Sequence, residues 1–229
     1  DMHNGHIIGG EALVRWQNDK EMIYPDQFIP VLEKNGYVID VDNFIWNKVC
    51  ACIKMMEDKG IEPVPISVNV SRMHVYQEKF TENLKNMAGE YGIDPKYIPL
   101  EITESAFTKE EGSLFKKVQS LQGYGFKFSM DDFGSGYSSL GMLKSERVDE
   151  VKIDKTFVDD IATDKGKVLL GNVIRMINEL GIDMIAEGVE TKEQADFLKE
   201  NGCMYAQGYY YYKPMPIEEF AKLLENSAR

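Results

Sequence analysis

The segment from Phe126 to Leu140, which reads FKFSMDDFGSGYSSL, places two adjacent carboxylates between an apolar stretch and a run rich in glycine and hydroxyl residues. The apolar stretch Phe126–Met130 has the length and composition of a buried strand. Asp131 and Asp132 follow at its carboxyl end. A metal site, a phosphate-binding turn and a plain polar turn are all compatible with this segment alone, so its role depends on what the fold places beside it.

Short apolar segments rich in β-branched residues recur along the chain and predict seven strands. They lie at about His6–Val14, Pro65–Val70, Ile98–Ile102, Lys127–Met130, Glu150–Ile153, Met184–Ala186 and Ala206–Tyr212. Helical patterns separate them, at 42–58, at 168–180 before Gly181, and at 191–202, where Thr191 and Gln194 match a capping box.

This alternation of strands and helices predicts the fold class. Strands that alternate with helices pair in parallel through right-handed crossovers. Seven or eight such units in 229 residues favour an α/β fold of the closed (β/α)8 TIM-like barrel type, with a doubly wound sheet as the structural alternative. No linker, low-complexity tract or shift in composition divides the chain, so we expect one domain over residues 1–229.

The composition excludes several classes of function. The net charge of −12, from 26 basic and 38 acidic residues, would repel a nucleic-acid polymer. No apolar run is long enough to span a membrane, and no signal-peptide pattern opens the chain. The three cysteines have no ligand-like spacing and are expected to be reduced core residues of a cytoplasmic protein. The three scattered histidines argue against a zinc site or a Ser-His-Asp triad.

Each predicted strand carries one polar residue at or near its carboxyl end, where a buried parallel strand is otherwise apolar. In chain order these residues are Glu11, Asn69, Glu101, Asp131, Lys152, Glu187 and Gln207. Any one of them alone is best explained as a solvated strand end or a helix cap. Seven in succession point to a shared site, because the strands of a barrel direct their carboxyl ends to the same mouth.

The residue types at this mouth indicate a cation site. Carboxylates buried together are costly unless cations lie among them. Carboxylate and amide oxygens, without Cys or His, are a hard ligand set that favours Mg²⁺ or Mn²⁺. The adjacent Asp131 and Asp132 would let one carboxylate bridge two ions, which is an arrangement suited to metal-assisted phosphodiester hydrolysis.

The chain resembles the EAL domain, the family of bacterial phosphodiesterases specific for cyclic di-GMP. The tripeptide that names this family opens the block Glu11–Trp16, EALVRW. Six further blocks occur in the family's order: VNVS at 68–71, LEITES at 100–105, DDFGSGYSSL at 131–140, VKID at 151–154, AEGVET at 186–191, and QGY at 207–209 followed by Lys213-Pro214. The resemblance runs from about Gly5 to Leu224.

The resemblance implies a modified (β/α)8 barrel that cleaves cyclic di-GMP to linear pGpG with two Mg²⁺ or Mn²⁺ ions. By the same resemblance, Glu11, Asn69, Glu101 and Asp131 would hold one ion, and Asp131 with Asp132 the second.

The family's other site residues carry over in the same way. Lys152 would orient the attacking water, and Glu187 would act as general base or as an outer ligand. Arg15 would pair with a substrate phosphate, Leu13 would line the guanine pocket, and Gln207 would contact the substrate or a metal-bound water.

Regulation in the family involves the glycine-rich loop. By resemblance, Glu104 would anchor the Asp131–Leu140 loop, although a helix N-cap is the plainer alternative for this residue. Relatives commonly form homodimers through the region after this loop, which here is Tyr137–Leu143 and the segment that follows.

One departure from the family pattern concerns the start of the barrel. Family members have a further strand about a dozen residues before the EAL tripeptide, and the ten residues before Glu11 do not match it. The first strand is therefore expected to be missing or truncated. A sensory or diguanylate cyclase domain in a longer parent protein would precede this segment, as in many relatives.

Two other functions fit parts of this pattern. Degenerate members of the family bind cyclic di-GMP or partner proteins without hydrolysis, but the acids, Lys152 and the glycine-rich loop are all retained here. A barrel lyase of the enolase type also uses strand-end acids around Mg²⁺. It needs a differently placed Lys or His base, and it explains neither Arg15 nor the loop.

Overall fold

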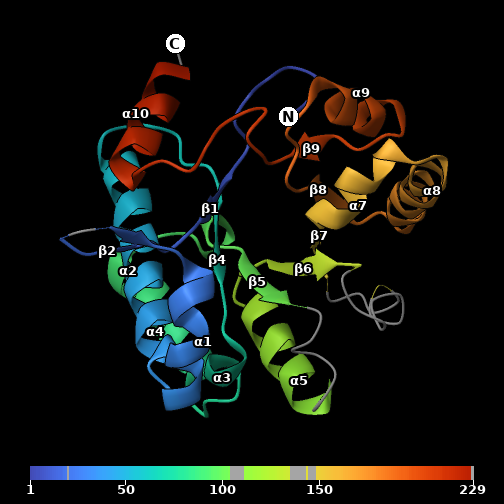
Figure 1. The fold of residues 1–229 in the computed structure, drawn as a ribbon. Coiled ribbons are helices and arrows are strands. Elements are labelled where there is room, and N and C mark those ends of the chain that lie inside the picture. The colour runs from blue at the N-terminus through green and yellow to red at the C-terminus, as the bar shows by residue number, and fades with distance from the viewer. Residues whose placement is uncertain (20, 104–110, 135–142, 144–147, 228–229) are drawn as a thin grey trace.

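Seven parallel strands form one curled sheet in the computed structural model, in the order β1-β4-β5-β6-β7-β8-β9 (Figure 1). The structure describes residues 1–19, 21–103, 111–134, 143 and 148–227. The strands of this sheet are β1 (Gly10–Ala12), β4 (Ile66–Asn69), β5 (Leu100–Thr103), β6 (Phe128–Phe133), β7 (Glu150–Ile153), β8 (Asp183–Ala186) and β9 (Tyr205–Ala206). All seven predicted strands are thus present and pair as expected.

The winding of the sheet distinguishes between the two fold types considered. Neighbouring strands in the sheet are also neighbours in chain order, apart from the small hairpin that follows β1. A doubly wound sheet instead reverses its strand order at a switch point. The single direction of winding confirms the α/β fold of the modified TIM-barrel type.

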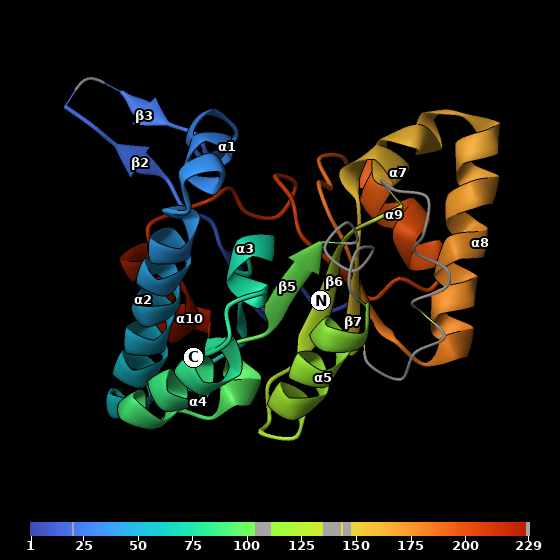
Figure 2. The same ribbon diagram turned by 90° about the horizontal axis from the view of Figure 1, so that it is seen from below.

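Helices surround this sheet on its outer side (Figure 2). They are α1 (Pro25–Asn35), α2 (Val38–Asp58), α3 (Arg72–Val75), α4 (Phe80–Tyr91), α5 (Glu111–Gln122), α7 (Lys155–Asp159), α8 (Asp164–Leu180), α9 (Lys192–Glu200) and α10 (Ile217–Ser227). Two short 3₁₀ helices lie at Pro95–Tyr97 and Asp160–Ala162. No helix in the described part of the chain is long and apolar enough to cross a membrane.

The predicted helix ends are confirmed by their backbone. Thr191 and Gln194 form the capping box at the start of α9. Gly181 ends α8 with φ +69°, a left-handed conformation that a residue without a Cβ adopts freely.

Alternating residues on the strands separate the apolar core from the barrel interior. Leu100 and Ile102 of β5 pack among α2, α4, α5 and α10, while Val151 and Ile153 of β7 pack among α7, α8 and α9. Because successive side chains on a strand point to opposite faces, the residues between them face inward. In β5 and β7 these inward residues are the charged Glu101 and Lys152, as a polar mouth requires.

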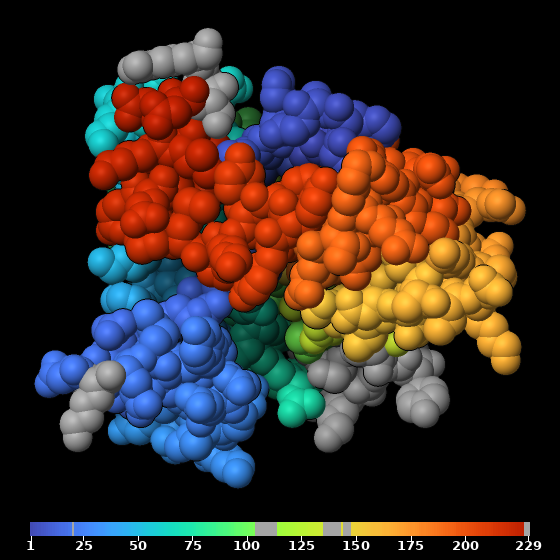
Figure 3. Space-filling model, turned by 45° about the horizontal axis from the view of Figure 1, so that its top comes forward, coloured from blue at the N-terminus to red at the C-terminus, as the bar shows by residue number. Residues whose placement is uncertain are grey.

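N-terminal and C-terminal segments of the chain meet where the sheet curls round. The Met2 amide donates to the Met204 carbonyl at 2.9 Å, and Gln207, just after β9, donates to Glu11 of β1 at 2.6 Å. Figure 3 shows the C-terminal elements, in red and orange, against N-terminal segments in blue. Residues 1–9 form no strand, so the sheet begins with β1, the strand that carries Glu11.

Two predicted strand ranges were too long. β1 is confined to Gly10–Ala12, and β9 ends at Ala206, so the tyrosines at 209–212 lie in a turn and not on a barrel strand. The strand stops because Gly208, with φ +157°, lies against the backbone of Val189, where a Cβ would approach to 2.2 Å. The amides of Tyr211 and Tyr212 then bond to the Gly208 carbonyl and close the turn.

A small lobe stands beside the barrel between β1 and α2. Strands β2 (Trp16–Gln17) and β3 (Met22–Ile23) pair antiparallel, and α1 follows them. The rings of Trp16 and Phe28 meet edge to face at 5.6 Å and join the hairpin to α1.

Candidate active site

Acidic side chains from several strands converge at the carboxyl ends of the sheet on one buried lysine. We call this group the acidic mouth; it consists of Glu11, Glu101, Asp131, Asp132 and Glu187 around Lys152. The Lys152 Nζ lies 3.1 Å from Glu11, 2.8 Å from Glu101, 3.5 Å from Asp131 and 2.7 Å from Glu187. With a side chain only 2% exposed, this ammonium cannot be compensated by water, so the carboxylates provide its solvation.

Two amide side chains extend the acidic mouth on the β1 side. Asn69, at the end of β4, donates to Glu11 Oε1 at 3.2 Å. Gln207 donates to Glu11 Oε2 at 2.6 Å, and the same oxygen faces Lys152. Both carboxylate oxygens of Glu11 are therefore held by residues from other strands.

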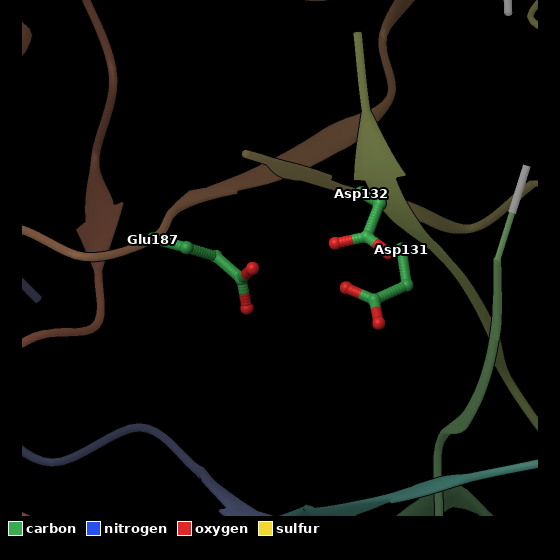
Figure 4. Close-up of side chains that lie close together, drawn as sticks. All are labelled: Asp131, Asp132 and Glu187. Carbon is green, nitrogen blue, oxygen red and sulfur yellow. The ribbon is translucent and has the colours of Figure 1, made fainter. Parts of the chain in front are cut away.

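A β-bulge places two successive aspartates on the same side of β6. Successive residues on a regular strand point to opposite faces. The β6–β7 register shifts between Met130 and Phe133, and Asp132 has a φ of +56°, the only positive φ of a non-glycine residue in the described ranges. As a result, ligand oxygens of Asp131, Asp132 and Glu187 all lie within 4.8 Å of one another. Figure 4 shows the side chains of the two aspartates directed toward Glu187.

Burial raises the pKa of three of these acids, Glu101, Asp132 and Glu187. It raises the pKa of Glu101 to about 8 against the opposing attraction of Lys152, and the neighbouring Glu11 and Asp131 raise this pKa further. Burial likewise raises the pKa of Glu187 to about 7, with Lys152 again opposing. Both carboxyl groups therefore exchange protons near neutral pH.

The pKa of the neighbouring Glu11 is lowered and that of Lys152 is raised, so both residues favour their charged forms. For Glu11, burial favours the neutral form, but the Lys152 charge and the bonds from Gln207 and Asn69 lower the pKa overall. For Lys152, burial again favours the neutral form, but the four facing carboxylates hold its pKa well above the usual value. Lys152 therefore stays charged at neutral pH.

The donor set fits a hard divalent cation. Five carboxylates share one ammonium, so the acidic mouth carries excess negative charge whenever its acids are ionised. Among the described residues, neither carboxylate oxygen of Glu101 has a hydrogen-bond partner of good geometry, although Oε1 lies close to Lys152. Within the described chain these buried oxygens lack such a partner, and they lie among other carboxylate oxygens and an amide. Oxygen ligands of this kind suit Mg²⁺ or Mn²⁺.

The remaining predicted site residues lie beside this group or outside the described chain. Leu13 follows β1 and is 41% exposed. Arg15 lies over the Tyr24 ring at 5.5 Å, and its Nη1 donates to the Val14 carbonyl at 2.8 Å. Glu104 and most of the Tyr137–Leu143 segment lie outside the described residues.

One buried polar group near the site was missed by the sequence analysis. Asp42 of α2 and His74 of α3 lie 3.2 Å apart, and both are almost fully buried. A signal was available, because Asp42 and Trp46 are four residues apart on one face of α2. His74 carries no such signal, since its proximity depends on how α3 packs.

Together, the fold and the site define a class of protein: a parallel barrel whose mouth presents acids for divalent cations. The EAL domain model matches residues 1–214, and the chain belongs to the EAL domain family.

Relatives and solved structures agree with this assignment. The chain is 35% identical over 217 residues to the oxygen sensor protein DosP of Escherichia coli, covering 94% of this chain and 27% of DosP. It is 36% identical over 228 residues to the probable cyclic di-GMP phosphodiesterase PdeB of the same species, covering 97% and 42%. A solved structure described as the PaMucR phosphodiesterase in complex with c-di-GMP superposes with a TM-score of 0.89 at 32% identity, covering 95% and 89% of the two chains. The chain thus spans less than half the length of these two curated relatives.

Proposed function

We propose that this chain is a metal-dependent phosphodiesterase that hydrolyses the bacterial second messenger cyclic di-GMP to linear pGpG. The observation that carries the proposal is the acidic mouth, with Lys152 in contact with four carboxylates. Relatives named as cyclic di-GMP phosphodiesterases, and a related structure with this ligand bound, support the choice of substrate.

Two ions, Mg²⁺ or Mn²⁺, are part of the proposal. Glu11, Asn69, Glu101 and Asp131 would hold the first, and Asp131 with Asp132 the second. The bulge in β6 supports the second group, because it brings both aspartates to one side. When bound, the ions would supply positive charge to the scissile phosphate and lower the pKa of a nearby water.

The protein residues would handle the proton and the developing charge. Water adds to phosphorus and the bond to one ribose O3′ breaks. The leaving O3′ takes up a proton from solvent, which gives a 3′-hydroxyl beside the new 5′-phosphate. Glu187, whose pKa lies near 7, would accept the proton of the water as general base. Lys152 stays charged beside it, at 2.7 Å, and would orient the water and stabilise the negative charge on the phosphate.

Residues at the rim would bind the rest of the substrate. Arg15 would move from the Tyr24 ring to pair with a phosphate, since a guanidinium binds phosphate through paired hydrogen bonds. The exposed Leu13 would line a guanine pocket, and Gln207 would contact the substrate. Glu104 is proposed as the anchor of the Asp131–Leu140 loop.

The proposal also covers the setting of this domain. We place residues 1–229 in one cytoplasmic EAL domain that forms a homodimer and belongs to a longer parent protein with a sensory or diguanylate cyclase domain before it. The lengths of the relatives support the longer parent.

The proposed function is tested by incubating the purified protein with cyclic di-GMP and Mn²⁺ and following pGpG by chromatography. We expect turnover by the wild type and a loss of at least about 100-fold in Glu11→Ala, since even outer partners of metal ligands are worth 10- to 100-fold. The exposed Glu62→Ala is the matched control and should retain the wild-type rate. If the protein binds cyclic di-GMP but forms no pGpG, the chain is a cyclic di-GMP receptor and not a phosphodiesterase.

A further inference from the structure

A buried polar cluster lies where α2 and α3 pack beside the end of β4. It consists of Asp42, Trp46 and His74, which are 5%, 1% and 1% exposed. The rings of Trp46 and His74 stack with centroids 4.4 Å apart and an interplanar angle of 12°. His74 Nδ1 lies 3.2 Å from Asp42 Oδ2. Buried polar groups are costly unless they are paired, so this cluster is a specified contact and not incidental packing.

The cluster holds the backbone at the end of β4 at two points. The Trp46 indole Nε1 donates to the Asn69 carbonyl at 3.1 Å. The Ser71 amide donates to Asp42 Oδ2 at 3.1 Å, and the Ser71 hydroxyl accepts from the His74 amide at 3.3 Å as the N-cap of α3. These bonds define the turn by which the chain leaves β4 and enters α3.

Asn69 connects this turn to the acidic mouth. Its side-chain amide reaches Glu11 Oε1 at 3.2 Å, and Glu11 in turn contacts Lys152 at 3.1 Å. The Asn69 side chain is exposed, so packing around it does not restrict its position. Its direction therefore depends on the backbone at residues 69–71, which the cluster holds.

We propose that Asp42, Trp46 and His74 are positioning residues, which hold the Asn69 side chain at the acidic mouth and thereby set the affinity for the divalent cation. None of the three touches the reacting atoms, and each acts through the backbone of the β4–α3 turn. This inference rests on the proposed function, because it concerns the same cation site.

The first test compares Trp46→Phe with Tyr91→Phe by titrating each protein with Mn²⁺ in a calorimeter. Trp46→Phe keeps an aromatic ring beside His74 but removes the donor to the Asn69 carbonyl. Tyr91→Phe removes a hydrogen bond to Asn47, also on α2, without contact to Asn69. We expect Trp46→Phe to weaken Mn²⁺ binding roughly tenfold and Tyr91→Phe to leave it unchanged. Excess Mn²⁺ should restore turnover in Trp46→Phe, which a general loss of folding would not allow.

A second pair of variants keeps the test independent of whether Trp46→Phe folds. Asp42→Ala removes the acceptor for the Ser71 amide, whereas Asp42→Asn retains a side-chain oxygen that can accept it. We expect Asp42→Ala to bind Mn²⁺ more weakly than the wild type and Asp42→Asn to bind it as the wild type does. Circular dichroism should show the same helix content in both variants and in the wild type.

The outcomes separate this inference from the proposed function. The positioning role alone is overturned if the wild-type protein binds Mn²⁺ and both variants, Trp46→Phe and Asp42→Ala, bind it with an affinity within twofold of the wild-type value. Wild-type protein that neither binds Mn²⁺ nor cleaves cyclic di-GMP would overturn the proposed function and the positioning role with it.

Discussion

Lys152 has an unusual environment for a lysine, with its side chain 2% exposed and its ammonium within 3.5 Å of four carboxylates. A buried charge of this kind depends on its partners, because removing either side leaves the other uncompensated. The exposed Lys155, three residues later, also pairs with two acids, Asp159 and Glu190. The two lysines therefore allow one side chain type to be compared in opposite environments.

Replacing these lysines should affect stability very differently. At pH 8 we expect Lys152→Met to lower the free energy of unfolding by about 3 kcal/mol, because several buried carboxylates lose their counter-charge. Lys155→Met should cost less than about 1 kcal/mol, since water screens its pairs. Urea denaturation of both variants and the wild type measures the difference. Equal losses in the two variants would contradict the view that Lys152 holds the acidic mouth together.

At the scale of the element, the end of β6 is tightly constrained. The bulge and the positive φ of Asp132 turn two aspartates to the same side. Gly134 follows with φ +99° against the ring of Phe157, where a Cβ would lie 1.9 Å from the ring carbon Cε2. α7 therefore packs directly on the residue that follows this strand. Backbone in rare conformations is maintained by such packing.

Gly134→Ala should disturb both stability and the site. Its new methyl group would displace Phe157 and shift the end of β6, at a cost of about 1–3 kcal/mol for overpacking in addition to the strained φ. Gly181→Ala is the matched control, because Gly181 also has a positive φ, +69°, but open space around it. We expect a larger fall in melting temperature for Gly134→Ala and weaker Mn²⁺ binding only in that variant. Comparable effects from both glycines would show that backbone conformation alone matters.

At the scale of the whole molecule, we expect the net charge of −12 and the crowded acidic mouth to couple folding to cation binding. Glu101 and Glu187 have pKa values of about 8 and about 7 in the folded chain, against the usual 4.5. Between pH 4.5 and about pH 8, the folded state therefore binds more protons than the unfolded chain. Stability from this source is complete below pH 4.5 and is lost as the pH rises through about 7 and then about 8.

The metal-free protein should accordingly melt at a lower temperature at pH 8 than at pH 5.5. Each kcal/mol of stability lost corresponds to roughly 2–4 °C for a chain of this size. Added Mn²⁺ should raise the melting temperature more at pH 8, where protons no longer compete for the carboxylates. Differential scanning calorimetry measures both effects, with Glu101→Gln as the variant in which the pH dependence should be weaker. A melting temperature that rises from pH 5.5 to pH 8 without metal would contradict this account.

The order of the strands, their polar ends, the C-terminal end of α8 and the capped start of α9 were all predictable from the sequence, whereas α8 begins at Asp164, four residues before the expected range. These features depend on local periodicity, on capping residues and on the rule that parallel strands end at one mouth. The same rule explains why Glu11, Asn69, Glu101 and Lys152 could be assigned to one site although they lie far apart in the chain. The hard-cation chemistry followed from residue types alone.

Other features were decided only by the tertiary structure. The bulge at Asp131 and Asp132 breaks the strand periodicity, and the close approach of Gly208 to Val189 ends β9 before its tyrosines. The contacts of Lys152 with four carboxylates, and the contact of His74 with Asp42, join residues from separate elements. Local patterns encode the type and direction of each element. Distances of a few ångströms between elements depend on packing, which no local pattern contains.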